Sequence, residues 1–149
     1  MVRVYLSLGS NLGDSEFILR EAVAALASLG AVQAVSKIHQ TKPMYFNDQP
    51  DFFNLTLSLD TALTPLDLLH CCQDIELRFG RQRPFPNAPR TLDIDIISYG
   101  DVVQDAPRLI LPHPRALERP FVLQPLYEIA PDWVCPRTGA RVADLVGVL

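Results

Sequence analysis

The order in which predicted strands and helices follow one another along the chain is compatible with only a few sheet topologies. The order is strand, helix, strand, strand, helix, strand, which is that of the split βαβ unit. The sequence therefore predicts an α+β fold of the ferredoxin-like βαββαβ kind, with helices packed on an antiparallel sheet. The strands are expected at 2–8, 31–38, 52–60 and 91–98, the helices at 15–29 and 65–78, and the longest loops at 40–51 and 78–90.

Shorter segments follow the fourth strand and are expected to form a C-terminal appendage to the sheet. Residues 101–111 predict a small hairpin or an edge strand, and 112–120 an irregular loop. Residues 121–129 predict a short helix that is disturbed near Pro125. With 149 residues, the chain is expected to form one domain over residues 1–149.

Charge and composition exclude several classes of protein. The net charge of −4 argues against binding to nucleic acid through overall electrostatic attraction. No apolar run approaches the roughly 18–20 residues that span a membrane, and the first residues turn polar too soon for a secretory signal. The 3 cysteines, an odd number, predict a reduced, cytoplasmic protein rather than a disulfide framework. We expect only small-molecule partners, and a monomer as the default.

Two carboxylates lie inside the fourth strand segment, TLDIDIIS. Side chains of a strand alternate between its faces, so Asp93 and Asp95 should point the same way and repel each other. One interpretation is a solvated strand face, where both carboxylates meet water. The other is a magnesium site, because Mg²⁺ is commonly held by one or two carboxylates together with substrate phosphates.

Basic side chains on both sides of this strand favour the magnesium interpretation. Arginine binds phosphate in a bidentate manner and keeps its charge, so cations beside a metal-binding pair suit a polyphosphate substrate. The segment GSNLG at 9–13 lacks the GK[ST] ending of a phosphate-binding Walker loop and predicts a turn. The flanking basic residues are Arg81, Arg83 and Arg90 before the pair, and Arg108, His113, Arg115 and Arg119 after it.

Four blocks of the chain together resemble the 6-hydroxymethyl-7,8-dihydropterin pyrophosphokinase family of folate biosynthesis. They are YLSLGSNLGD (5–14), DQPDFFN (48–54), PRTLDIDII (89–97) and LPHPRALERPFVL (111–123). The resemblance implies a ferredoxin-like fold and the transfer of a pyrophosphoryl group from ATP to the hydroxymethyl oxygen of the pterin, with release of AMP. The chain would then be an ATP-dependent diphosphokinase without a protein nucleophile.

The resemblance also implies roles for individual residues. Asp93 and Asp95 correspond to the family's ligands for two magnesium ions, with ATP as co-substrate. The catalytic positions correspond to Arg81, Arg90, Asp93, Asp95 and His113. The ATP-binding positions correspond to Leu69, Gln73, Glu76, Arg81, Arg83, Arg90, Ile96, Arg108, His113 and Arg119. The pterin-binding positions correspond to Thr41, Pro43, Met44, Phe52, Asn54 and Phe121, where two aromatic rings could enclose a flat heterocycle.

Two departures from the family and two alternative functions remain. Asn87-Ala88 stand where some members have Trp, and Pro114 stands where some have Tyr, so we expect loop closure to differ in detail. The alternatives are a regulatory module that binds nucleotide without turnover, and a metal-dependent phosphohydrolase or nucleotidyltransferase that uses the aspartate pair. The pterin-side block DQPDFFN argues against both.

Overall fold

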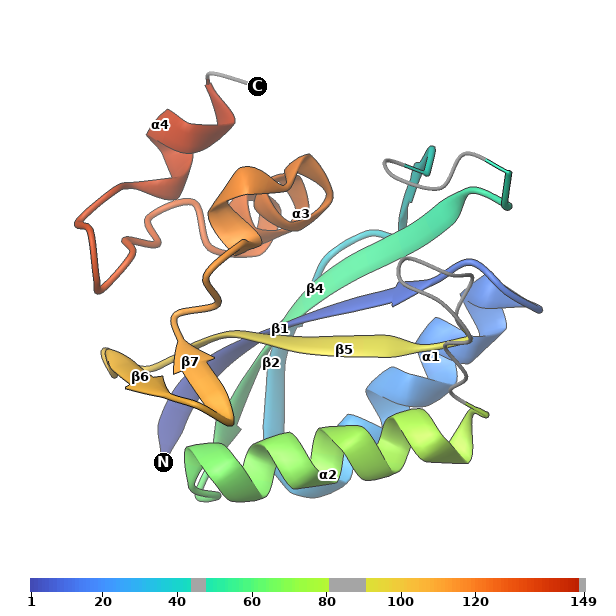
Figure 1. Cartoon of the computed structure of the whole chain (residues 1–149), viewed down its shortest axis with the longest axis horizontal. Coiled ribbons are helices and arrows are strands. Elements are labelled where there is room, and N and C mark those ends of the chain that lie inside the picture. Colours follow the sequence, from blue (N-terminus) through green and yellow to red (C-terminus); the bar gives the residue numbers. More distant parts are fainter. Residues whose placement is uncertain (44–47, 81–90, 148–149) are drawn as a thin grey trace.

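The computed structural model describes residues 1–43, 48–80 and 91–147 and forms one five-stranded antiparallel sheet with helices on both faces (Figure 1). The strand order is β2-β4-β1-β5, and β3 also pairs with β4. The α+β class predicted from the sequence is confirmed. The strands of this sheet are β1 (Val2–Ser10), β2 (Ala31–Val35), β3 (His39–Thr41), β4 (Phe52–Thr61) and β5 (Asp93–Tyr99).

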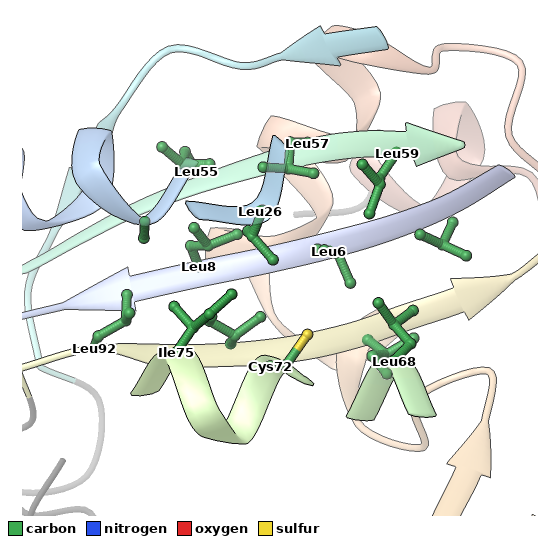
Figure 2. Packing of buried hydrophobic residues seen from close by; sticks show 14 of the residues in the cluster. Leu6, Leu8, Leu26, Leu55, Leu57, Leu59, Leu68, Cys72, Ile75 and Leu92 are labelled. Carbon is green, nitrogen blue, oxygen red and sulfur yellow. The ribbon is translucent and has the colours of Figure 1, made fainter. Parts of the chain in front are cut away.

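One face of the sheet carries the larger hydrophobic core. Leucines at alternate positions of β1 and β4 point from the sheet toward α1 (Ser15–Leu26) and α2 (Pro65–Arg78) (Figure 2). Burial of these side chains is the main stabilising contribution, because each fully buried leucine contributes roughly 1.5–3 kcal/mol. The fully buried leucines of the two strands are Leu6, Leu8, Leu57 and Leu59.

The opposite face of the sheet is covered by α3 (Pro120–Ile129), which packs on β4 and against α4 (Val142–Val146) (Figure 1). Ile97 of β5 belongs to this second core, together with Val122 and Leu126 of α3. Since α3 does not extend over the start of β5, the first residues of that strand are only partly covered. This uncovered end of the face is where the two aspartates lie.

The first two helices begin where the sequence predicts. The side chain of Asp14 accepts a hydrogen bond from the backbone N–H of Phe17, and that of Thr64 from the N–H of Asp67, so each caps its helix. Pro65 occupies the first turn of α2, where its missing N–H costs nothing. The cap residues therefore fix both helix starts locally.

The second strand is shorter than predicted. It was expected to run over 31–38 with a loop over 40–51, but β2 ends at Val35 and β3 begins at His39. The reason lies at Ser36, whose Oγ, rather than its carbonyl oxygen, accepts the hydrogen bond from the N–H of Thr56. The side chain thus replaces the backbone in the ladder, and regular pairing stops there.

The C-terminal segments agree with the expected order. The hairpin predicted at 101–111 is formed by β6 (Gln104–Ala106) and β7 (Leu109–Leu111), and the expected loop contains a short 3-10 turn, Ala116–Glu118. The last predicted helix, α3, continues through Pro125, where one backbone N–H donor is missing from the helix. Among the described residues, no helix is long and apolar enough to cross a membrane.

Candidate active site

Asp93 and Asp95 lie at the start of β5 on the face opposite the leucine core. Both are half-buried, whereas Ile94 and Ile96 between and after them are buried in that core. Asp95 is paired with Ser7 of β1, and Asp93 with Gly9. The period of two predicted from the sequence is therefore present, and both carboxylates belong to one sheet face.

A histidine and an arginine from the segment after β7 approach the second aspartate. His113 Nε2 lies 3.9 Å from Asp95 Oδ1, and Arg119 Nη1 lies 3.9 Å from Asp95 Oδ2. These distances are too long for direct hydrogen bonds, so the imidazole and the guanidinium lie near the carboxylate without a direct hydrogen bond to it. The three side chains thus bring a carboxylate, an imidazole and a guanidinium together at one end of the sheet face.

The backbone holds His113 in a defined orientation. Its N–H donates to the Ile97 carbonyl at 2.8 Å, and its ring Nδ1 accepts from the N–H of Arg115 at 3.2 Å. Since Nδ1 is the acceptor, the proton of the neutral ring lies on Nε2, which faces Asp95. Burial and the nearby charge of Arg119 lower the pKa of His113, so the neutral ring that donates through Nε2 is favoured.

Arg119 connects the aspartate to an aromatic ring. Its guanidinium carbon lies 5.7 Å from the centre of the Phe121 ring, within range of a cation–π contact. Its Nε is buried and has no hydrogen-bond partner among the described residues. A buried donor without an acceptor is costly, which suits a residue whose acceptor is a ligand.

A second polar cluster lies across Gly9 from the aspartates. Gly9 is paired with Asp93 on one side and with Asn54 of β4 on the other. The Nδ2 of Asn54 donates to Thr41 Oγ1 at 3.3 Å. A Cβ atom at Gly9 would lie 2.8 Å from Asn54 Oδ1. Only glycine therefore leaves the sheet face between Asn54 and Asp93 without a side chain. Asn54, which is buried, and Asp93, which is half-buried, thereby flank Gly9 on the same face of the sheet.

The aromatic and proline positions predicted for the pterin border this cluster. Phe52 is paired with Thr41 at the start of β4, and Phe121 lies in the first turn of α3; both rings are half-buried. Pro43 is half-buried at the end of the described part of its loop, and Met44 lies outside the described residues. The enclosure of a heterocycle between the two rings remains a prediction.

Two of the predicted nucleotide positions, Glu76 and Ile96, lie at the outer edge of β5. Glu76 of α2 is buried, and its Oε2 accepts a hydrogen bond of 2.8 Å from the N–H of Ile94. Alternation along the strand directs the backbone of Ile96 to the same edge, while its side chain is in the core. Ile96 can therefore contact a nucleotide only through its backbone.

The remaining nucleotide positions differ in exposure. Leu69 packs at the margin of the leucine core, and Gln73 is exposed. Arg108, between β6 and β7, is exposed and has its Nη2 3.3 Å from His70 Nε2. Arg81, Arg83 and Arg90 lie outside the described residues, as do Asn87 and Ala88.

Two polar residues that connect distant segments, Asn11 and Glu128, were not predicted from the sequence. Asn11, expected only to form a turn, is buried, and its Nδ2 donates to Gln49 Oε1 at 2.7 Å and to the Pro50 carbonyl at 3.1 Å. It thus joins the GSNLG turn to the block that precedes β4. Glu128 bonds to Lys37, just before β3, and to His39, the first residue of β3. The signal for Asn11 was available, because both partners belong to the family-like blocks, whereas nothing in the sequence marks Glu128.

The fold and this site define a class of protein: α+β domains with a carboxylate pair beside cationic side chains, suited to a divalent metal and phosphate groups. The family model described as 7,8-dihydro-6-hydroxymethylpterin-pyrophosphokinase matches residues 5–131. The chain belongs to this family.

Individual relatives agree with the family match. The 2-amino-4-hydroxy-6-hydroxymethyldihydropteridine pyrophosphokinase of Bacillus subtilis is 45% identical over 146 residues, which are 97% of this chain and 87% of that protein. The Pseudomonas aeruginosa protein of the same name is 44% identical, over 97% of this chain and 90% of its own length. The folic acid synthesis protein of Pneumocystis carinii is 43% identical over 95% of this chain, which spans only 19% of that protein.

The fold also occurs in solved structures. The crystal structure of Plasmodium falciparum HPPK-DHPS with pteroate matches with a TM-score of 0.79 over 99% of this chain and 42% of that chain. At 16% identity, this likeness shows the fold alone.

Proposed function

We propose that this protein transfers a pyrophosphoryl group from Mg²⁺–ATP to the hydroxymethyl oxygen of 6-hydroxymethyl-7,8-dihydropterin, giving the diphosphate ester and AMP for folate synthesis. The observation that carries the proposal is the position of Asp95, which faces His113 and Arg119 within the segment matched by the family. The Asn54–Thr41 cluster, across Gly9 from Asp93, supplies the polar contacts that a pterin requires.

Asp93 and Asp95 are proposed to hold two magnesium ions. Their chemistry fits, since hard divalent cations prefer oxygen ligands and Mg²⁺ is usually held by only one or two carboxylates. No group of three or more His, Cys, Asp or Glu that could hold a metal occurs in the described part of the chain. The remaining ligands would therefore be phosphate oxygens and water. When bound, the ions would neutralise the phosphates and polarise the attacked phosphorus.

The protein's own residues would act by binding and positioning. The Nε2–H of His113 and the guanidinium of Arg119 would donate to phosphate oxygens, in agreement with the buried, unpaired Nε of Arg119. In the proposed mechanism the pterin alcohol attacks the β-phosphorus in line, so no protein nucleophile is needed. The further contacts proposed are Arg81, Arg83 and Arg90 for ATP phosphates, Leu69, Gln73, Glu76, Ile96 and Arg108 for the nucleotide, and Thr41, Pro43, Met44, Phe52, Asn54 and Phe121 for the pterin.

The wider assignments are part of the same proposal. The strand order β2-β4-β1-β5, with every neighbouring pair antiparallel, supports a ferredoxin-like fold to which α3 and α4 are appended. Residues 1–149 are proposed to act as one domain and as a monomer. The three free cysteines agree with a reducing, cytoplasmic location.

Phosphorus NMR of a reaction with ATP, Mg²⁺ and 6-hydroxymethyl-7,8-dihydropterin tests this function. We expect AMP to form in step with the diphosphate ester. Accumulation of ADP would indicate γ-phosphoryl transfer and contradict the proposal. Nucleotide cleavage without a pterin product would favour the phosphohydrolase alternative, and binding without turnover the regulatory module.

A further inference from the structure

We infer that Glu128 is a positioning residue for the pterin, which sets the place of α3 relative to β3 and so the distance between the two sides of the pterin site. This inference rests on the proposed function. It assigns a role to a residue that lies at the opposite end of α3 from Phe121.

Both carboxylate oxygens of Glu128 are engaged by one short segment. Oε2 accepts a hydrogen bond of 2.6 Å from the backbone N–H of Lys37, and Oε1 lies 3.0 Å from His39 Nε2. These partners are 91 and 89 residues away in the sequence. Glu128 and His39 are 31% and 28% exposed, so water screens their interaction only in part.

The segment held by Glu128 leads directly into one side of the proposed pterin site. His39 begins β3 and is paired with Asn54 of β4, while Thr41 ends β3 and is paired with Phe52. A displacement of His39 would therefore move Thr41 and its hydrogen bond with Asn54. Pro43 follows two residues later.

The helix that carries Glu128, α3, forms the other side of the proposed pterin site. Phe121 lies in the first turn of α3, two residues after Arg119, and Glu128 lies in the last turn. A helix of ten residues is rigid along its length of about 15 Å. Fixing its last turn to β3 therefore fixes the angle at which its first turn, with Phe121, stands over the sheet.

The structure offers little to replace this connection. Ser36, between β2 and β3, still bonds to Thr56 of β4 through its N–H and its Oγ, but β3 itself is only three residues long. Without the carboxylate, the N–H of Lys37 would lose its acceptor, and His39 would lose the partner of its Nε2. The hydrogen-bond network of Ser36 would remain, since it binds Thr56 and not α3.

The test compares Glu128→Ala, Glu128→Gln and the wild type by calorimetric titration. Pterin affinity is measured in the presence of a non-hydrolysable Mg²⁺–ATP analogue, and analogue affinity is measured separately. We expect Glu128→Ala to weaken pterin binding about tenfold and to change analogue affinity by less than about twofold, as expected for the loss of hydrogen bonds to a charged group. Glu128→Gln, whose amide oxygen still accepts from Lys37, should recover pterin affinity to within about threefold of wild type.

A matched control is Asp144→Ala, which removes another carboxylate with two hydrogen bonds, to Arg141, far along the chain from β3. It should leave both affinities unchanged. Equal pterin affinity in Glu128→Ala and wild type, or an equal loss of analogue affinity, would overturn the inference. If Glu128→Ala does not fold, His39→Ala replaces it, and unchanged pterin affinity in that variant would count against the inference in the same way. Failure of the wild type to bind the pterin would instead refute the proposed function.

Discussion

At the scale of single residues, Gly9 controls access to the sheet face between the two polar clusters. In Gly9→Ala, the new Cβ would meet Asn54 Oδ1 at 2.8 Å and displace its amide from Thr41. We expect pterin affinity to fall at least about tenfold, with little change in analogue affinity. Gly147→Ala is the control, because the nearest atom to its Cβ lies at 3.5 Å. Similar effects of the two substitutions on pterin affinity would show that the absence of a side chain at Gly9 does not matter for pterin binding.

The aspartate pair gives a second prediction at this scale. Asp93→Asn and Asp95→Asn should each abolish most turnover, because they remove a charge from the proposed magnesium site. Both proteins should stay folded, since either change also removes a like-charge neighbour on the same face. Steady-state rates and thermal unfolding measure the two effects, with the exposed Asp101→Asn as control. Near-normal rates of either variant at saturating Mg²⁺ would refute the metal assignment.

Glu128 also predicts a pH dependence of stability. Burial opposes its ionisation, but hydrogen bonds from the Lys37 N–H and His39 outweigh this, so the pKa of Glu128 lies below its ordinary value. A lowered carboxyl pKa stabilises the fold above the unfolded-state pKa, and this contribution is lost as pH falls through the folded-state pKa. The difference in melting temperature between wild type and Glu128→Gln should therefore shrink between about pH 5.5 and pH 3. A constant difference would contradict this.

At the scale of elements, Arg137 fastens the C-terminal segment to the β6–β7 hairpin. Its Nη2 donates to the carbonyls of Gln104 and Leu111, and to Asp105 at 2.8 Å. Arg137→Ala should accelerate hydrogen exchange of residues 104–111 while global stability falls by no more than about 1 kcal/mol. Asp105→Ala, which preserves both carbonyl contacts, should have a smaller effect. Equal hydrogen exchange of residues 104–111 in all three proteins would show that the hairpin is stable without the contacts of Arg137.

At the scale of the whole molecule, the charges predict that the two substrates bind cooperatively. Without Mg²⁺–ATP, Asp93 and Asp95 repel each other, and Arg119 beside Phe121 has no phosphate to bind. Nucleotide binding would fix Arg119, and with it the Phe121 ring on the pterin side. We expect the pterin to bind at least about tenfold tighter with a non-hydrolysable Mg²⁺–ATP analogue present, or roughly 1.4 kcal/mol. Equal pterin affinities in calorimetric titrations with and without the analogue would show that the pterin site is already formed in the free protein.

Local rules were enough to predict the element order and part of the site. The starts of α1 and α2 follow from caps within three residues, and the shared face of Asp93 and Asp95 follows from the period of a strand. The four family-like blocks are enough to indicate the pyrophosphokinase family, whose model matches residues 5–131. These features depend on near neighbours in sequence or on short motifs, which a single sequence displays.

Contacts between distant segments were decided only by the tertiary structure. The break between β2 and β3 depends on Ser36 bonding to a strand twenty residues away. The carboxylate of Asp95 meets His113 and Arg119 only because the chain returns along the edge of β5, and Glu128 meets Lys37 only because α3 lies across the sheet. Such pairings depend on strand register and helix packing, which no local period encodes, since one shifted register would place every side chain on the other face.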